Sequence, residues 1–105
     1  MTLCVAIRED GKLERLQCSQ NKLHEHLGGP LVFVGAVDAM GAVIVARRHP
    51  DASHAAHCWS GVWPVYEPCV RGPIVVAGTD AEGGELDLDI DRLIRALPLY
   101  LVQTL

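Results

Sequence analysis

The chain has 105 residues, of which 50% are hydrophobic and 21% charged, and its formal net charge is −4 at pH 7. This composition is typical of one globular domain over residues 1–105 and excludes an intrinsically disordered chain. The acidic balance argues against a nucleic-acid partner, because binding to a phosphate backbone requires a basic surface.

The first seven residues are mostly apolar but contain no basic residue, and Arg8, Glu9 and Asp10 interrupt the apolar run at once. This pattern predicts a first strand over residues 2–8 and not a secretory signal. No run of about 18 apolar residues occurs, so we expect no membrane-spanning helix. We therefore expect a cytoplasmic protein that has no membrane partner and whose cysteines are reduced.

The next two predicted elements are short. Residues 13–18 show a weak alternation of apolar and polar side chains, which predicts a hairpin partner for the first strand. A helix is expected over residues 20–27, with Ser19 as its N-cap. Gly28 can take the left-handed conformation that ends a helix.

Two mostly buried antiparallel strands are expected at residues 31–34 and 42–46, joined by a turn at 38–41. Residues 49–72 contain several prolines and no sustained period, so we expect a long loop there. Another buried strand is predicted at 73–77, followed by a turn.

The last predicted element is a helix that begins near Asp87 or Asp89. Leu93 and Leu97 recur at helical spacing, and Pro98 ends the helix. The expected order is β(β)αββ-loop-βα. The predicted fold class is therefore α+β, with a small, mostly antiparallel sheet of four to five strands and two short helices.

Two segments resemble a known family. Residues 19–34 have the form of a short helix that ends in Gly28-Gly29 before a strand, and residues 71–84 have the form of a closing strand and turn. These segments are similar to a small uncharacterised domain family found in phages, plasmids and actinobacteria. The resemblance implies an accessory protein of a mobile genetic element and supplies no catalytic residues.

The loop between residues 49 and 69 is rich in groups that can bind zinc, which prefers four nitrogen or sulfur ligands. Its candidate ligands are His49, His54, His57, Cys58 and Cys69. No Cys-x-x-Cys pair occurs, so a solvated loop without a metal is the alternative. A further alternative is a thiol-dependent hydrolase in which Cys58 is the nucleophile.

Two tryptophans and a tyrosine, Trp59, Trp63 and Tyr66, lie close together in the same loop. They either cover the core or form a recognition surface, because Trp and Tyr are enriched at binding hot spots. The apolar carboxyl-terminal residues, Tyr100 and Leu101 among them, either pack on the sheet or form a subunit interface.

The function that we expect from these features is non-enzymatic. The chain would be an accessory protein without a cofactor that acts by binding another protein, which could be a second copy of itself. Zinc binding through the loop and a thiol-dependent hydrolase are the two alternatives.

Overall fold

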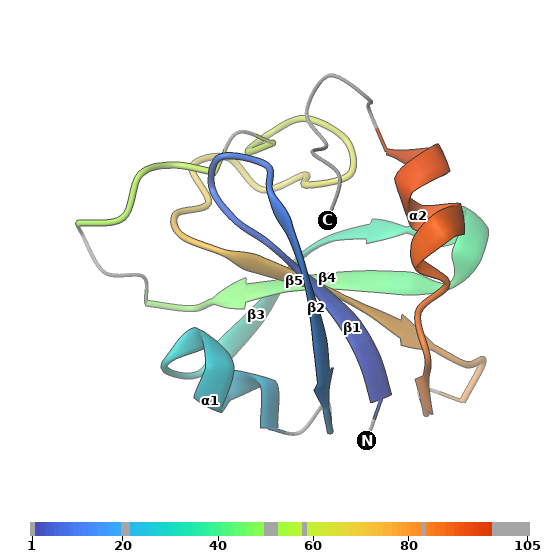
Figure 1. Ribbon diagram of the computed structural model, residues 1–105. Coiled ribbons are helices and arrows are strands. Elements are labelled where there is room, and N and C mark those ends of the chain that lie inside the picture. The colour runs from blue at the N-terminus through green and yellow to red at the C-terminus, as the bar shows by residue number, and fades with distance from the viewer. Residues whose placement is uncertain (1, 20–21, 50–52, 58, 83, 98–105) are drawn as a thin grey trace.

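A computed structural model of the chain describes residues 2–19, 22–49, 53–57, 59–82 and 84–97. Its centre is one six-stranded antiparallel sheet, in which five strands follow the order β2-β1-β5-β4-β3 and β6 pairs with the end of β5 (Figure 1). The strands are β1 (Thr2–Ile7), β2 (Leu13–Cys18), β3 (Leu31–Val37), β4 (Ala42–Arg47), β5 (Ile74–Thr79) and β6 (Glu85–Leu86).

The mostly antiparallel α+β architecture predicted from the sequence is confirmed, and the number of strands slightly exceeds the prediction. The additional strand is β6, whose two residues pair with Gly78 and Thr79 at the end of β5. A two-residue strand has too few positions to show an alternation of apolar and polar side chains.

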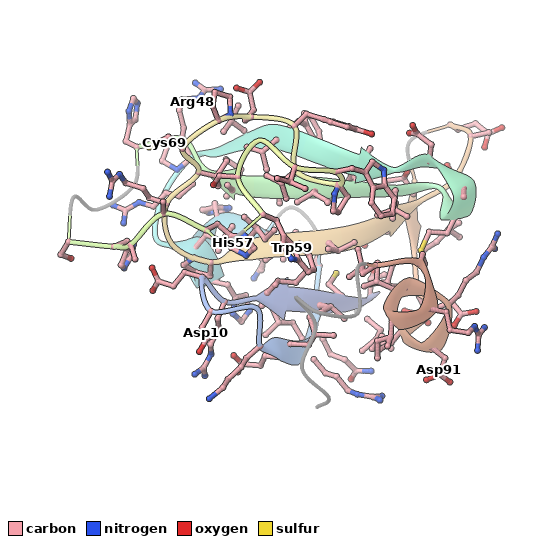
Figure 2. The ribbon with its side chains drawn as sticks, turned by 90° about the horizontal axis from the view of Figure 1, so that it is seen from above. Asp10, Arg48, His57, Trp59, Cys69 and Asp91 are labelled. Atoms are coloured by element: carbon pink, nitrogen blue, oxygen red, sulfur yellow. The ribbon has the colours of Figure 1, made fainter. Side chains whose placement is uncertain are left out.

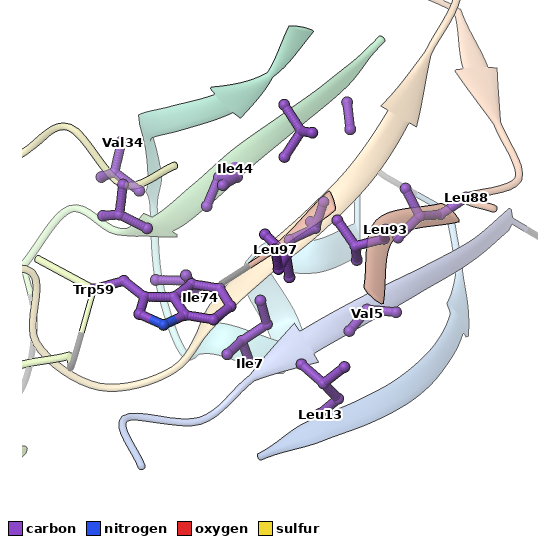
Figure 3. Packing of buried hydrophobic residues seen from close by; sticks show 14 of the residues in the cluster. Val5, Ile7, Leu13, Val34, Ile44, Trp59, Ile74, Leu88, Leu93 and Leu97 are labelled. Atoms are coloured by element: carbon purple, nitrogen blue, oxygen red, sulfur yellow. The ribbon is translucent and has the colours of Figure 1, made fainter. Parts of the chain in front are cut away.

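One face of the sheet carries the larger core. Helix α2 (Ile90–Ala96) and the loop residues Trp59, Val65 and Val70 cover this face, as Figure 3 shows for the helix and for Trp59. Ile90, Leu93 and Leu97 lie on the buried side of α2. Asp89 caps the helix, because its Oδ1 accepts a hydrogen bond of 3.0 Å from the backbone N–H of Arg92.

On the opposite face, α1 (Leu23–Leu27) is the one helix of the described residues that packs on the sheet (Figure 1). Leu23 and Leu27 are four residues apart and are both buried against the sheet. Gly28 ends the helix with a φ of 85°, as predicted. Lys22 is at the N-cap position of α1 as described, and the Ser19 hydroxyl donates to Glu85; residues 20 and 21, with which the predicted helix begins, lie outside the described residues.

Strand β3 is more exposed than the sequence predicted. Its neighbour β4 is largely buried, but β3 lies at the edge of the sheet, where Val32 is 38% and Phe33 71% exposed. A bulge between Phe33 and Gly35 shifts its register against β4. The predicted turn between the two strands is confirmed as a short 3-10 helix, Asp38–Met40, followed by Gly41.

Among the described residues, no helix has the length and apolar character needed to cross a membrane.

Candidate interaction surface at strand β3

Six large hydrophobic side chains are exposed in the described chain, and five of them come from β3 or from the loop segment bonded to it. The six are Val32, Phe33, Val62, Trp63, Tyr66 and Leu86. The first five belong either to β3 or to the loop segment that crosses it, and we name these five residues the β3-edge face. Single exposed apolar residues are normal on a protein surface, but a gathering of this kind marks a contact surface.

Backbone hydrogen bonds hold the loop against β3. The N–H of Tyr66 donates to the carbonyl of Val34 at 2.9 Å, and the N–H of Ala36 donates to the carbonyl of Pro64 at 3.3 Å. A Cβ atom added to Gly35 would lie 2.0 Å from the carbonyl oxygen of Pro64. Glycine at position 35 therefore allows the loop to approach the strand closely.

The buried residues of this loop segment determine which side chains face outward. The side chains of Pro64 and Val65 are fully buried, whereas those of Trp63 and Tyr66, on either side of them in the chain, are 41% and 56% exposed. The two rings are attached to a backbone that is bonded to β3 on both sides of Gly35. Both rings therefore extend from a backbone segment that hydrogen bonds fix against β3.

The structure places Trp59 in the core, so its expected role as a partner-binding residue is corrected. Its side chain is 0% exposed and packs against the sheet with Ile7 and Ile74 nearby (Figure 3). The His57 ring contacts it edge to face, with a centroid distance of 5.6 Å. Trp59 thus covers the core beneath the loop.

His57 is also buried, with 2% of its side chain exposed. Its Nδ1 accepts a hydrogen bond of 3.1 Å from the backbone N–H of Trp59, so the proton of the neutral ring is on Nε2. Burial lowers the pKa of His57, and the carbonyl groups of Ile7 and Arg8 oppose this effect.

Three buried polar atoms near this position have no hydrogen-bond partner in the described part of the chain: Nε2 of His57, Nε1 of Trp59 and Oε2 of Glu9. The negative charge of Glu9 also opposes the lowering of the His57 pKa. We interpret His57 as a neutral side chain buried between Trp59 and the β1–β2 hairpin.

The residues proposed as zinc ligands have different environments. His49 and Cys69 are exposed, His54 is half-buried and His57 belongs to the core. Cys58, which is also the proposed hydrolase nucleophile, lies outside the described residues. Within the part of the chain that the structure describes, no three His, Cys, Asp or Glu side chains gather as a metal site would require.

A second feature next to the β3-edge face is a hollow of about 240 Å³. Val32, Val34, Ala46 and Val70 form its apolar part, and Arg47, Arg48, Glu67, Cys69 and Arg71 complete it. We name it the arginine hollow. Arg48 is exposed, and Arg71 donates from Nη1 to the carbonyl of His54 at 3.0 Å.

Sequence reasoning did not identify Val32, Phe33 or Arg71 as parts of a surface. Arg47 and Arg48 are the only adjacent pair of lysine or arginine residues in the sequence. Arg71 lies near them in the structure because β4 and β5 are neighbouring strands. Tyr100 and Leu101, the other expected contact residues, lie outside the described residues.

Two further hollows flank α1 on the opposite face of the sheet, with volumes of about 370 and 260 Å³. The smaller one is lined by Val32 and Phe33 among others, so it reaches the β3-edge face from the other side. The apolar surface around β3 therefore continues around the edge of the sheet.

No protein family, curated protein or solved structure matches this chain. The family of mobile-element proteins expected from the helix–Gly-Gly–strand signature therefore stays a prediction.

Proposed function

We propose that this chain is a non-enzymatic protein-binding domain that contacts its partner through the β3-edge face. The observation that carries the proposal is that exposed apolar side chains, Phe33, Trp63 and Tyr66 among them, come from β3 and from the loop bonded to it, with Phe33 on the α1 side of the sheet. Aromatic side chains supply much of the binding energy at protein interfaces. In keeping with the sequence resemblance, we propose an accessory protein of a phage or plasmid that acts in the cytoplasm.

The backbone hydrogen bonds that fix the loop against β3 favour a binding role for the exposed aromatic rings over a purely structural one. Removing Phe33 or Trp63 from water would bury apolar surface at little cost in conformational entropy, since the loop is already held by hydrogen bonds to Val34 and Ala36. A preorganised face of this kind favours recognition of a folded partner.

A photo-crosslinking experiment tests the proposal even though the partner is unidentified. The photoreactive amino acid benzoylphenylalanine is placed at Trp63 in one variant and, as the control, at the exposed Arg95 of α2 in another. After illumination in cells, position 63 should yield discrete protein adducts that position 95 does not. Adding Phe33→Ala to the position 63 variant should lower the adduct yield about tenfold, the effect expected when one hot-spot contact is lost.

If illumination at position 63 gives no more adduct than at position 95, the β3-edge face is not a contact surface. Circular dichroism of each variant confirms that the domain remains folded, as expected for substitutions at exposed positions.

A further inference from the structure

The basic residues around the arginine hollow lie at one end of strand β5. Arg71 lies three residues before Ile74, the first residue of β5; Arg47 is the last residue of the neighbouring β4, and Arg48 follows it. No ion pair joins these arginines to an acidic side chain among the described residues. The chain as a whole carries a charge of −4, so these cations form a local exception.

The opposite end of β5 is acidic. Glu85 pairs with Thr79, the last residue of β5. Within residues 84–91, which we name the acidic segment, four exposed acidic residues alternate with apolar ones; the acids are Glu85, Asp87, Asp89 and Asp91. Figure 2 shows the separation, with Arg48 and Cys69 at one end of the molecule and Asp91 at the other.

The acidic segment also carries the one exposed large hydrophobic side chain of the described residues that the β3-edge face does not include. Leu86 is 48% exposed and is flanked by Glu85 and Asp87. The two ends of the molecule are therefore complementary in two respects: one carries arginines and the other carboxylates, and the half-exposed Val32 of the arginine hollow matches an exposed leucine. Three of the carboxylates also accept hydrogen bonds within the chain, Glu85 from Thr2 and Ser19, Asp87 from the N–H of Leu3 and Asp89 from the N–H of Arg92.

We propose that the β3-edge face and its arginine hollow bind the acidic segment of a second copy of the same chain, in a head-to-tail arrangement. Leu86 of one copy contacts the exposed Val32 at the apolar side of the hollow, and the carboxylates of the acidic segment lie near Arg48 and Arg71. This inference rests on the proposed function, because it names the partner of the same surface.

Charge and geometry favour this occupant over a nucleic acid. Three arginines in a chain of net charge −4 make a thin footprint for a phosphate backbone. Two different surfaces meet in the proposed contact, so the association is heterologous and does not stop at a dimer. Its dependence on charge makes it sensitive to salt.

Sedimentation equilibrium of the full chain tests the inference. At low salt the weight-average mass should rise with concentration above the monomer mass of 11.4 kDa, and it should fall back towards that mass at about 0.5 M salt, where charges are screened. Arg48→Glu, which reverses a charge in the arginine hollow, and Leu86→Lys, which changes the acidic segment, should each weaken self-association at least tenfold. The control Arg95→Glu makes the same charge change on α2 and should leave self-association unchanged.

Mixing the two defective variants gives the sharpest result. Arg48→Glu retains an intact acidic segment, and Leu86→Lys retains an intact β3-edge face. An equimolar mixture should therefore form a one-to-one dimer that does not grow further, although neither variant associates alone.

Several outcomes overturn the inference. They are a wild-type chain that remains monomeric at every concentration, self-association that survives either variant, and a mixture that does not recombine. Binding of a labelled 20-nucleotide single-stranded DNA that Arg48→Glu abolishes would assign the hollow to nucleic acid instead. If position 63 crosslinks only to other proteins while the chain stays monomeric, the proposed function stands and this inference fails.

Discussion

Trp59 and Trp63 lie four residues apart in the same loop, yet they have opposite environments. Trp59 is fully buried against the sheet, whereas 41% of the Trp63 side chain is exposed. The backbone of His57 donates to Val70 within the loop, which holds the segment around Trp59 over the core. The hydrogen bonds between Pro64–Tyr66 and β3 instead hold Trp63 at the outer edge of the sheet. Where each part of the loop is attached therefore decides which ring is core and which is surface.

The largest expected effect is a difference in the free energy of unfolding between variants of Trp59 and of Trp63. Trp59→Ala should lower the free energy of unfolding by about 3–5 kcal/mol, because it leaves a cavity in the core. Trp63→Ala should change it by about 0.5 kcal/mol or less, as is usual for exposed positions. Urea unfolding followed by circular dichroism measures both. Equal losses in the two variants would mean that the loop does not divide into a core part and a surface part.

A smaller effect is expected where the loop crosses the strand. In Gly35→Ala, the new Cβ would lie 2.0 Å from the Pro64 carbonyl oxygen, so the loop must move away from β3. Overpacking of this kind costs about 1–3 kcal/mol. Hydrogen exchange should then show faster exchange of the Tyr66 and Ala36 amides, whose bonds join loop and strand.

Gly29→Ala is the matched control for this substitution. The added Cβ would lie 3.3 Å from Nε of Arg47, a flexible side chain that can move aside. The free energy of unfolding of Gly29→Ala should therefore remain close to that of the wild type. If Gly35→Ala is as stable as Gly29→Ala and leaves the Tyr66 amide protected, the loop is not held against β3 by these hydrogen bonds.

The smallest effect concerns pH and the buried part of the loop. Because burial lowers the pKa of His57, the unfolded chain takes up a proton at a higher pH than the folded chain. The contribution of His57 to stability is therefore fully present above pH ~6.5 and is lost as the pH falls below that value. The loss is at most about 1.4 kcal/mol per pH unit for one proton.

Unfolding measured between about pH 7.5 and 5, the range in which an ordinary histidine titrates, checks this sign. His57→Gln should flatten the dependence, whereas the exposed His49→Gln should leave it as in the wild type. A protein that gains stability as the pH falls through about 6, or a His57→Gln variant with an unchanged profile, contradicts the neutral, buried role of His57.

Much of the fold was predictable because the relevant signals are local. The alternation in Leu3, Val5 and Ile7 predicts β1, and the spacing of Leu93 and Leu97 with an acid at position 89 predicts the capped helix α2. These patterns depend on neighbours within a few residues, so a single sequence contains them.

The exposure of β3 was not predictable in the same way. Phe33 lies in a run of β-branched and aromatic residues that is typical of a buried strand, and nothing in that run shows that β3 forms the edge of the sheet. Exposure depends on strand order, which follows from the pairing of β4 with β5 across the long loop. The candidate surface could therefore be located in the loop but not extended to the strand.

By itself the sequence determined the α+β class, the approximate position of each main strand and both helices, and a loop with an unusual gathering of aromatic residues. Only the tertiary structure decided that Trp59 belongs to the core, that Trp63 and Tyr66 join Phe33 at the edge of the sheet, and that Arg71 joins Arg48. The physical reason is that secondary structure follows from interactions between near neighbours in the chain. Burial and surface composition instead follow from contacts between segments that are distant in sequence.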